Sequence, residues 1–147
     1  MKHIVVRYSE KFGATIDLHN KVAQENGFVW FGKMGSTIAN RWIRIFDEQL
    51  SRGQNTFLFL VRRDGTRYVF HKARILQIQR DSVPATTEMP GYYADHNLIR
   101  QMSCFFKIDL LKPCLKNEIE KIRLASSGSP VTETLSGSMA GLFIVES

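Results

Sequence analysis

TFLFLVRRDGTRYVFHKARILQIQ, residues 56–79, contains two apolar runs that flank an Asp-Gly dipeptide at 64–65. Aromatic and β-branched runs on either side of Asp-Gly are a strong short-range signal for a β-hairpin. The sequence therefore predicts paired strands at 56–61 and 66–79. The second strand is too long for a flat sheet and its alternation slips near 72–74, which predicts a bulge or a bend around a barrel.

Shorter apolar segments on both sides of this hairpin predict further elements. We expect strands at 3–9, 28–31, 104–111 and 141–145. Thr15 and Ser36 are suitable caps for two helices, the first of which would stop at Gly27, and 117–124 predicts a short third helix. The loop at 81–97 is long enough to suggest a function. These elements predict an α+β fold, a single domain over residues 1–147 built as a small partly open β-barrel of five or six strands flanked by two or three helices.

The charge of the chain is concentrated in its middle. Lys and Arg number 20 against 14 Asp and Glu, and the net charge is +6. Residues 41–80 carry nine basic and only three acidic side chains, and eight of the nine are Arg. The arginine fork suits phosphates and base edges, so this segment favours a nucleic-acid partner over a merely solvated basic face. The candidate phosphate-binding residues are Lys33, Arg62, Arg63 and Arg67.

Several function classes are disfavoured by missing signals. No apolar window is long enough for a membrane span, and the charged N-terminal residues are unlike a signal peptide, so we expect a cytoplasmic protein. The two cysteines are too few for a disulfide scaffold, and neither they nor the histidines have zinc-ligand spacing. Gly27-x4-Gly32-Lys33 resembles a phosphate-binding loop, but Met34 replaces the magnesium-binding Ser or Thr. We therefore expect no enzyme activity, no metal and no cofactor.

Trp30 and the adjacent Tyr92 and Tyr93 are the aromatic candidates for ligand contact. Trp42 lies in the apolar stripe of the second helix, which predicts a core position. Trp30 has two open interpretations: a strand residue buried in the core or a ring that contacts a ligand. Tyr92 and Tyr93 lie in the Pro/Gly-bounded loop, where ligand contact explains two adjacent phenols better than packing does. Asp95 follows them and offers a polar group for a base edge.

Short motifs along the chain together resemble the PUA-like superfamily. The motifs are VWFGK-x-G at 29–35, Pro-x-Tyr-Tyr at 90–93, SCFFKI at 103–108 and the C-terminal LASSGSP…GLFIV. Within that superfamily the chain is most similar to the EVE and YTH branch, particularly to the EVE-like modules of modification-dependent restriction proteins. The resemblance spans nearly the whole chain.

This resemblance implies a module that flips one modified base out of a nucleic acid, preferably DNA, into an aromatic cage. The implied base-binding residues are Trp30, Tyr92, Tyr93, Ser9 and Asp95. Tyr8 stands where the family pattern has a tryptophan near the end of the first strand, so the third cage wall stays open. Base–aromatic stacking and Arg–phosphate contacts together can offset the cost of unstacking a base.

Two other classes of function remain as alternatives. One is a PUA-like RNA-binding accessory domain that reads shape and phosphates without modified-base specificity. The other is a protein-interaction module whose basic face meets an acidic partner. We also expect that the chain is the N-terminal module of a longer protein that contains a motor or nuclease, or that it works with a separate motor or nuclease subunit.

Overall fold

The predicted hairpin organises the computed structural model, which describes residues 1–147 except residue 139. Its strands are β3 (Phe57–Asp64) and β4 (Arg67–Gln79). Asp64 pairs with Arg67, and Gly65 in the intervening two-residue loop has φ 64°. That left-handed conformation favours glycine, which explains why the Asp-Gly signal located the turn.

β4 changes partner along its length, and this bends the sheet. Residues 67–74 pair with β3, whereas residues 75–79 pair with β5 (Met102–Ile108). The register shifts between Ile75 and Gln77, which leaves Leu76 as the bulged residue. The predicted bulge therefore exists but lies just beyond Lys72–Arg74, at the point where one partner strand replaces the other.

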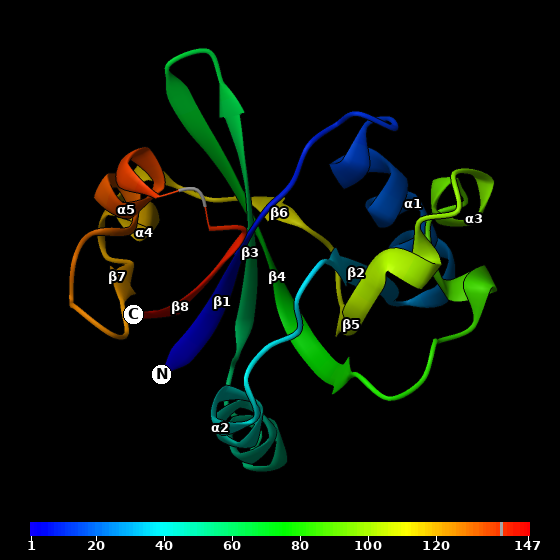
Figure 1. The fold of residues 1–147 in the computed structure, drawn as a ribbon, viewed down its shortest axis with the longest axis horizontal. Helices are drawn as coiled ribbons and strands as arrows, with labels where there is room; N and C mark the ends of the chain where they lie inside the picture. The colour runs from blue at the N-terminus through cyan, green and yellow to red at the C-terminus, as the bar shows by residue number, and fades with distance from the viewer. Residues whose placement is uncertain (139) are drawn as a thin grey trace.

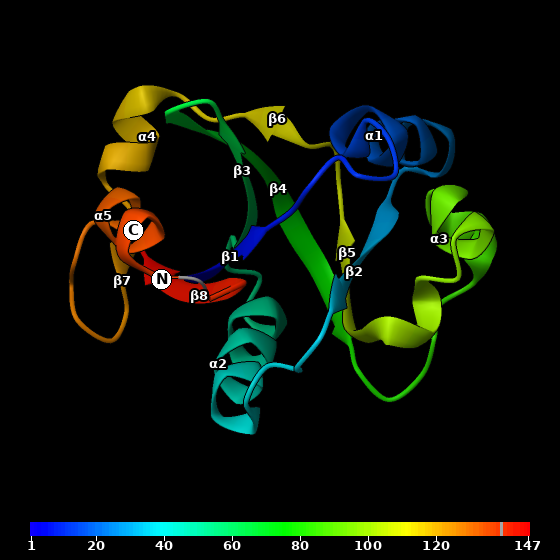
Figure 2. The ribbon, with the colours of Figure 1, turned by 45° about the horizontal axis from the view of Figure 1, so that its top comes forward.

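The strands form one mostly antiparallel sheet in the order β2-β5-β4-β3-β1-β8-β7, with β6 paired to β4. The remaining strands are β1 (Lys2–Arg7), β2 (Val29–Met34), β6 (Lys112–Pro113), β7 (Arg123–Leu124) and β8 (Leu142–Glu146). Only the β1–β3 pairing is parallel among those of the described residues. β2 and β7 end the sheet, so it curls without closing into a barrel (Figure 2). The described residues contain more strands than we expected, because β6 and β7 are two-residue pairings with no sequence signal.

Helices cover the sheet on three sides. They are α1 (Thr15–Asn26), α2 (Asn40–Ser51), α3 (Tyr92–Asp95), α4 (Lys116–Glu120) and α5 (Val131–Gly137), with 3-10 turns η1 (Thr86–Glu88) and η2 (Ile99–Gln101). The main core fills the curled sheet and receives apolar side chains from α1 and α2. A second cluster lies under α4 and α5, and a third lies between β2–β5 and residues 89–99. Among the described residues, no helix has the length and apolar character needed to cross a membrane.

The predicted helix ends are partly confirmed. Gly27 ends α1 with φ 84°, as predicted. The predicted caps are wrong, because Ala14 and Ala39 occupy the cap positions of α1 and α2. Thr15 is instead the first helical residue, and its hydroxyl donates to the Ser9 carbonyl at 3.3 Å. α2 begins four residues after Ser36, because Ile38 is buried before the helix starts.

Candidate nucleic-acid interface

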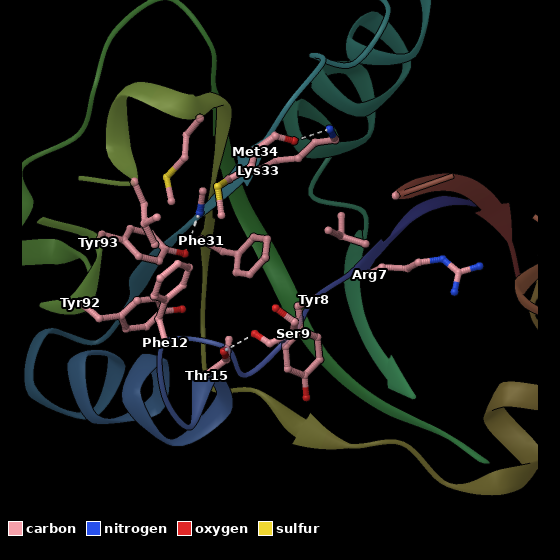
Figure 3. A pocket seen from close by; sticks show the side chains of 15 residues that line it. Arg7, Tyr8, Ser9, Phe12, Thr15, Phe31, Lys33, Met34, Tyr92 and Tyr93 are labelled. Atoms are coloured by element: carbon pink, nitrogen blue, oxygen red, sulfur yellow. Dashed lines mark hydrogen bonds between the residues drawn. The ribbon is translucent and has the colours of Figure 1, made fainter. Parts of the chain in front are cut away.

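A pocket of about 400 Å³ lies where the end of β1 faces the free edge of β2. Its lining comes from β1 and the following loop, from α1, from β2 and from residues 92–102 (Figure 3). The lining residues are Val6, Arg7, Tyr8, Ser9, Phe12, Thr15, Phe31, Gly32, Lys33, Met34, Tyr92, Tyr93, Leu98, Met102 and Gly141. The pocket therefore lies beside the free edge of β2, and its volume is in the range of small-molecule sites.

Aromatic rings dominate the surface of this pocket. Phe12, Tyr8 and Tyr92 are half-buried and Phe31 is buried. Figure 3 shows all four rings gathered around the same hollow. Flat apolar walls with a few polar groups suit a planar heterocycle, which gains both stacking and burial.

One continuous hydrogen-bond chain joins three walls of the pocket. The Gly32 amide of β2 donates to the Tyr93 hydroxyl at 3.1 Å, and that hydroxyl lies 2.8 Å from His19 Nε2. His19 Nδ1 lies 2.7 Å from the carbonyl of Thr15. Because a carbonyl can only accept, Nδ1 carries the proton and Nε2 accepts the Tyr93 proton. The chain reaches the loop after β1 through the bond from Thr15 to Ser9.

Burial keeps this chain in a single protonation state. His19 is fully buried, and burial lowers its pKa to about 4. Burial also raises the pKa of Tyr93 well above its usual value. Both side chains are therefore neutral near pH 7, and the direction of each hydrogen bond is fixed.

A polar group lies at the other side of the pocket, beyond the end of β1. Tyr8 Oη, Arg62 Nε and His71 Nδ1 are buried atoms without a hydrogen-bond partner among the described residues. The Arg62 guanidinium lies beside the Tyr8 hydroxyl, and its Nε is 3.5 Å from Glu10 Oε1. Because these atoms are buried, Tyr8 contributes its ring to the pocket while its hydroxyl lies against Arg62.

The structure removes Trp30 from the predicted cage. Its side chain is only 4% exposed and does not line the pocket. Successive β2 side chains point to opposite faces, so Val29 and Phe31 enter the main core while Trp30 packs under residues 89–98. Its indole nitrogen donates to Glu88 Oε1 at 3.3 Å. The interpretation of 28–31 as buried on both faces is therefore the correct one.

The paired tyrosines differ in exposure. Tyr93 is only 3% exposed and belongs to the third apolar cluster, so the prediction of two exposed phenols is wrong. Tyr92 remains half-buried at the pocket surface, with its ring 5.0 Å from that of Tyr93 and perpendicular to it. Tyr92 therefore offers a ligand the larger contact surface, whereas the buried Tyr93 ring packs against Tyr92.

The other predicted site residues fall into two groups. Ser9 and Lys33 line the pocket, but Lys33 Nζ donates to the carbonyls of Met34 at 2.9 Å and Ser36 at 2.5 Å. Burial also lowers the pKa of Lys33. Asp95 is exposed and lies outside the lining residues.

The nine cations of residues 41–80 do not form one patch. Arg62, Arg63 and Arg67 lie on the β3–β4 hairpin, whereas Arg41 and Arg44 lie on α2 at the opposite end of the molecule (Figure 1). Strand register places Arg62 and Arg67 on one face of the hairpin and Arg63 on the other. The charge that is contiguous in the sequence is therefore spread along the hairpin strands, α2 and the residues that follow them.

Phe12 of the pocket lining and His19 of the hydrogen-bond chain behind it were missed by sequence reasoning. Phe12 follows two charged residues in a loop, where a single aromatic residue carries no periodic signal. His19 shares no ligand spacing with the other histidines, and its partner Tyr93 is 74 residues away. Only the three-dimensional structure reveals these contacts. Within the described residues, no three His, Cys, Asp or Glu side chains gather as a metal site requires.

Comparison with known proteins gives one family. The family described as Pua-like matches residues 4–134, a segment that contains every pocket-lining residue except Gly141. No curated protein and no solved structure matches the chain. The matched segment runs from β1 to α5, and the open sheet with its covering helices is consistent with this fold. The chain belongs to the Pua-like family.

Proposed function

We propose that this chain binds nucleic acid, preferably DNA, and holds one extruded methylated base in the pocket between β1 and β2. In this proposal it is a cytoplasmic recognition module and not an enzyme. It would serve a modification-dependent restriction system whose motor or nuclease is a separate domain or subunit.

Family membership supports the coarser part of this function. A Pua-like domain supports a nucleic-acid-binding module, in agreement with the net charge of +6. The preference for DNA and the restriction role have support only from the EVE-like motifs of the sequence.

The observation that carries the base-binding part is the aromatic pocket itself. Phe12, Tyr8 and Tyr92 present partly exposed ring surface to one cavity of about 400 Å³. Stacking contributes about 1–3 kcal/mol per base, which is comparable to the cost of extruding it. Ser9, an exposed residue of the lining, supplies a hydroxyl for the base edge.

A methyl group on the base suits such walls. Burying one methyl contributes about 0.8 kcal/mol, and better stacking raises the preference to about 1–3 kcal/mol. This range corresponds to about five- to a hundred-fold in affinity. N6-methyladenine and methylated cytosine both meet this requirement.

The experiment is a fluorescence anisotropy titration of matched DNA duplexes that differ by one N6-methyladenine or one 5-methylcytosine. We expect tighter binding of one modified duplex by the wild-type protein. Phe12→Ala and Tyr92→Ala should reduce or abolish the preference. Phe57→Ala removes a half-buried ring outside the pocket, so it should retain the preference.

Equal affinity for every modified and plain duplex would contradict the reader function. The same titration with RNA of matched sequence tests the alternative. Tighter binding of plain RNA would replace the proposal by an RNA-binding accessory domain. Binding that Phe57→Ala weakens as much as Phe12→Ala would place the contact away from the pocket.

A further inference from the structure

Two arginines on α2 have no acidic partner. Arg41 and Arg44 are exposed and, being three residues apart, lie side by side on the helix surface. Ion pairs of the described residues involve Lys2, Arg52, Arg62 and Lys72, and none involves Arg41 or Arg44. The Arg41 guanidinium instead lies 5.1 Å from the centre of the Trp42 ring. A stacked guanidinium is held in place while its donors remain free for a ligand.

The order of charges along α2 is unfavourable for the helix itself. The first turn contains no acidic residue, and the last turn contains no basic one. Arg41 and Arg44 lie in the first half, whereas Asp47 and Glu48 lie in the second half. A helix dipole favours the opposite order, so helix stability does not explain these arginines. Their donors remain available to an anionic partner.

The α2 arginines are continuous with the rim of the pocket. β2 ends at the lining residues Lys33 and Met34, and α2 begins after five intervening residues. Arg80, at the end of β4, donates to Asn40 Oδ1 at 2.7 Å and to the carbonyl of Ile38 at 3.4 Å. It therefore adds a third cation to the N-terminal end of α2.

The arginines of the β3–β4 hairpin lie beyond the opposite rim of the pocket. Arg62 lies beside Tyr8, and Arg67 follows on the same face of the hairpin. Figure 1 shows the turn of the β3–β4 hairpin and α2 at opposite ends of the sheet. The pocket thus lies between two groups of cations.

We propose that the nucleic-acid backbone crosses the mouth of the pocket from the hairpin to α2, and that Arg41, Arg44 and Arg80 form a second phosphate anchor. The proposal rests on the proposed nucleic-acid function. It adds the path of the strand, with Arg62 and Arg67 on one side of the extruded base and the α2 arginines on the other.

The test measures the salt dependence of DNA binding by an Arg41→Ala/Arg44→Ala variant. The probe is a 20-base-pair duplex with one N6-methyladenine or 5-methylcytosine, titrated by anisotropy at several salt concentrations. Each lost phosphate contact should lower the slope of log K against log salt by about 1, so the double variant should lose about 2. Its ratio of modified to plain affinity should not change, because phosphate contacts carry no base information.

An Arg52→Ala/Arg123→Ala variant is the matched control. It also removes two positive charges. Arg52 is paired with Glu48 of α2, and Arg123 is an exposed residue of β7. Its slope should remain that of the wild type. If the Arg41→Ala/Arg44→Ala variant has the same slope of log K against log salt as the control, the α2 anchor is overturned. A folded Arg41→Ala/Arg44→Ala variant that has lost the methyl preference would also overturn it, because the substitutions would then have changed the pocket.

The two proposals can fail separately. Wild-type binding without methyl preference would contradict the base reader and leave the backbone path standing. A methyl preference together with a wild-type salt slope in the Arg41→Ala/Arg44→Ala variant would contradict the backbone path and leave the base reader standing. Absence of binding to any duplex or matched RNA would overturn both.

Discussion

The hydroxyl of Tyr93 is the point at which three elements of the pocket meet. It accepts from Gly32 on β2 and donates to His19 on α1, while its own ring belongs to α3. A buried hydroxyl with two partners restricts the movement of all three walls. Preorganisation of this kind lowers the cost of ligand binding.

The buried histidines should make the stability of the protein depend on pH. Burial lowers the pKa of His19 and of His3 from 6.5 to about 4. Between these pH values the unfolded chain binds more protons than the folded one, so the free energy of unfolding falls as pH decreases from about 6.5 to about 4. The stabilisation by the neutral histidines is fully present above that window. Urea unfolding at several pH values checks this. His19→Gln should make the free energy of unfolding depend less steeply on pH. If the free energy of unfolding of the wild type does not change between pH 4 and pH 6.5, the effect is disproved.

The two tryptophans should differ in their contribution to stability. Trp30→Ala should reduce the free energy of unfolding by about 3–5 kcal/mol, because it leaves a cavity beneath residues 89–98. Trp42 is only half-buried, so Trp42→Ala should reduce it less. Thermal or urea melts of both variants give the comparison. The interpretation fails if Trp42→Ala is the more destabilised protein.

At the scale of elements, the hairpin was predictable because its signal is local. Strand β8 and the end of α1 at Gly27 were predictable for the same reason. The start of α2 was not, since the burial of Ile38 against distant strands outweighs the capping preference of Ser36. α5 carries only a short apolar pattern, and its position depends on Arg7, which donates to the Leu135 carbonyl at 2.7 Å.

The candidate site was only partly predictable for a related reason. Ser9 and Tyr92, both indicated by the family resemblance, line the pocket. The face of β2 that carries Trp30 could not be assigned, because 28–31 is apolar on both faces and has no alternation to read. Which face meets the pocket depends on residues 89–98, which pack over Trp30 from a distant part of the sequence.

The packing of β2 on β5 gives a prediction at this scale. A Cβ at Gly32 would lie 2.0 Å from Met102 Sδ, so the thioether occupies the space of the missing side chain. Gly32→Ala should displace Met102 and reduce stability by about 1–3 kcal/mol. In a Met102→Ala background the same substitution should cost much less. Equal costs in the two backgrounds, measured by urea unfolding, would exclude this contact as the cause.

At the scale of the whole molecule, β4 belongs to both halves of the sheet. It pairs with β3 along one part and with β5 along the other. Neither half can lose β4 without exposing apolar surface of the main core. The two halves should therefore unfold together.

Single-tryptophan variants test this cooperativity. Trp42→Phe leaves Trp30 as a reporter on β2, and Trp30→Phe leaves Trp42 as a reporter on α2. In each variant the fluorescence and the far-ultraviolet circular dichroism should give the same urea midpoint. Separate midpoints within one variant would show that the halves unfold independently.

The neighbouring positions of β1 and β8 have a practical consequence for building with this domain. Lys2 pairs with Glu146, so the N-terminus and the C-terminus lie side by side at one end of these two strands, as Figure 1 shows. A short peptide can therefore join them, and new ends can be opened at the exposed turn between Gly65 and Thr66. Such a circular permutant would carry a fused reporter at the tip of the basic hairpin, where a dye or fluorescent protein would report binding of the proposed nucleic-acid ligand.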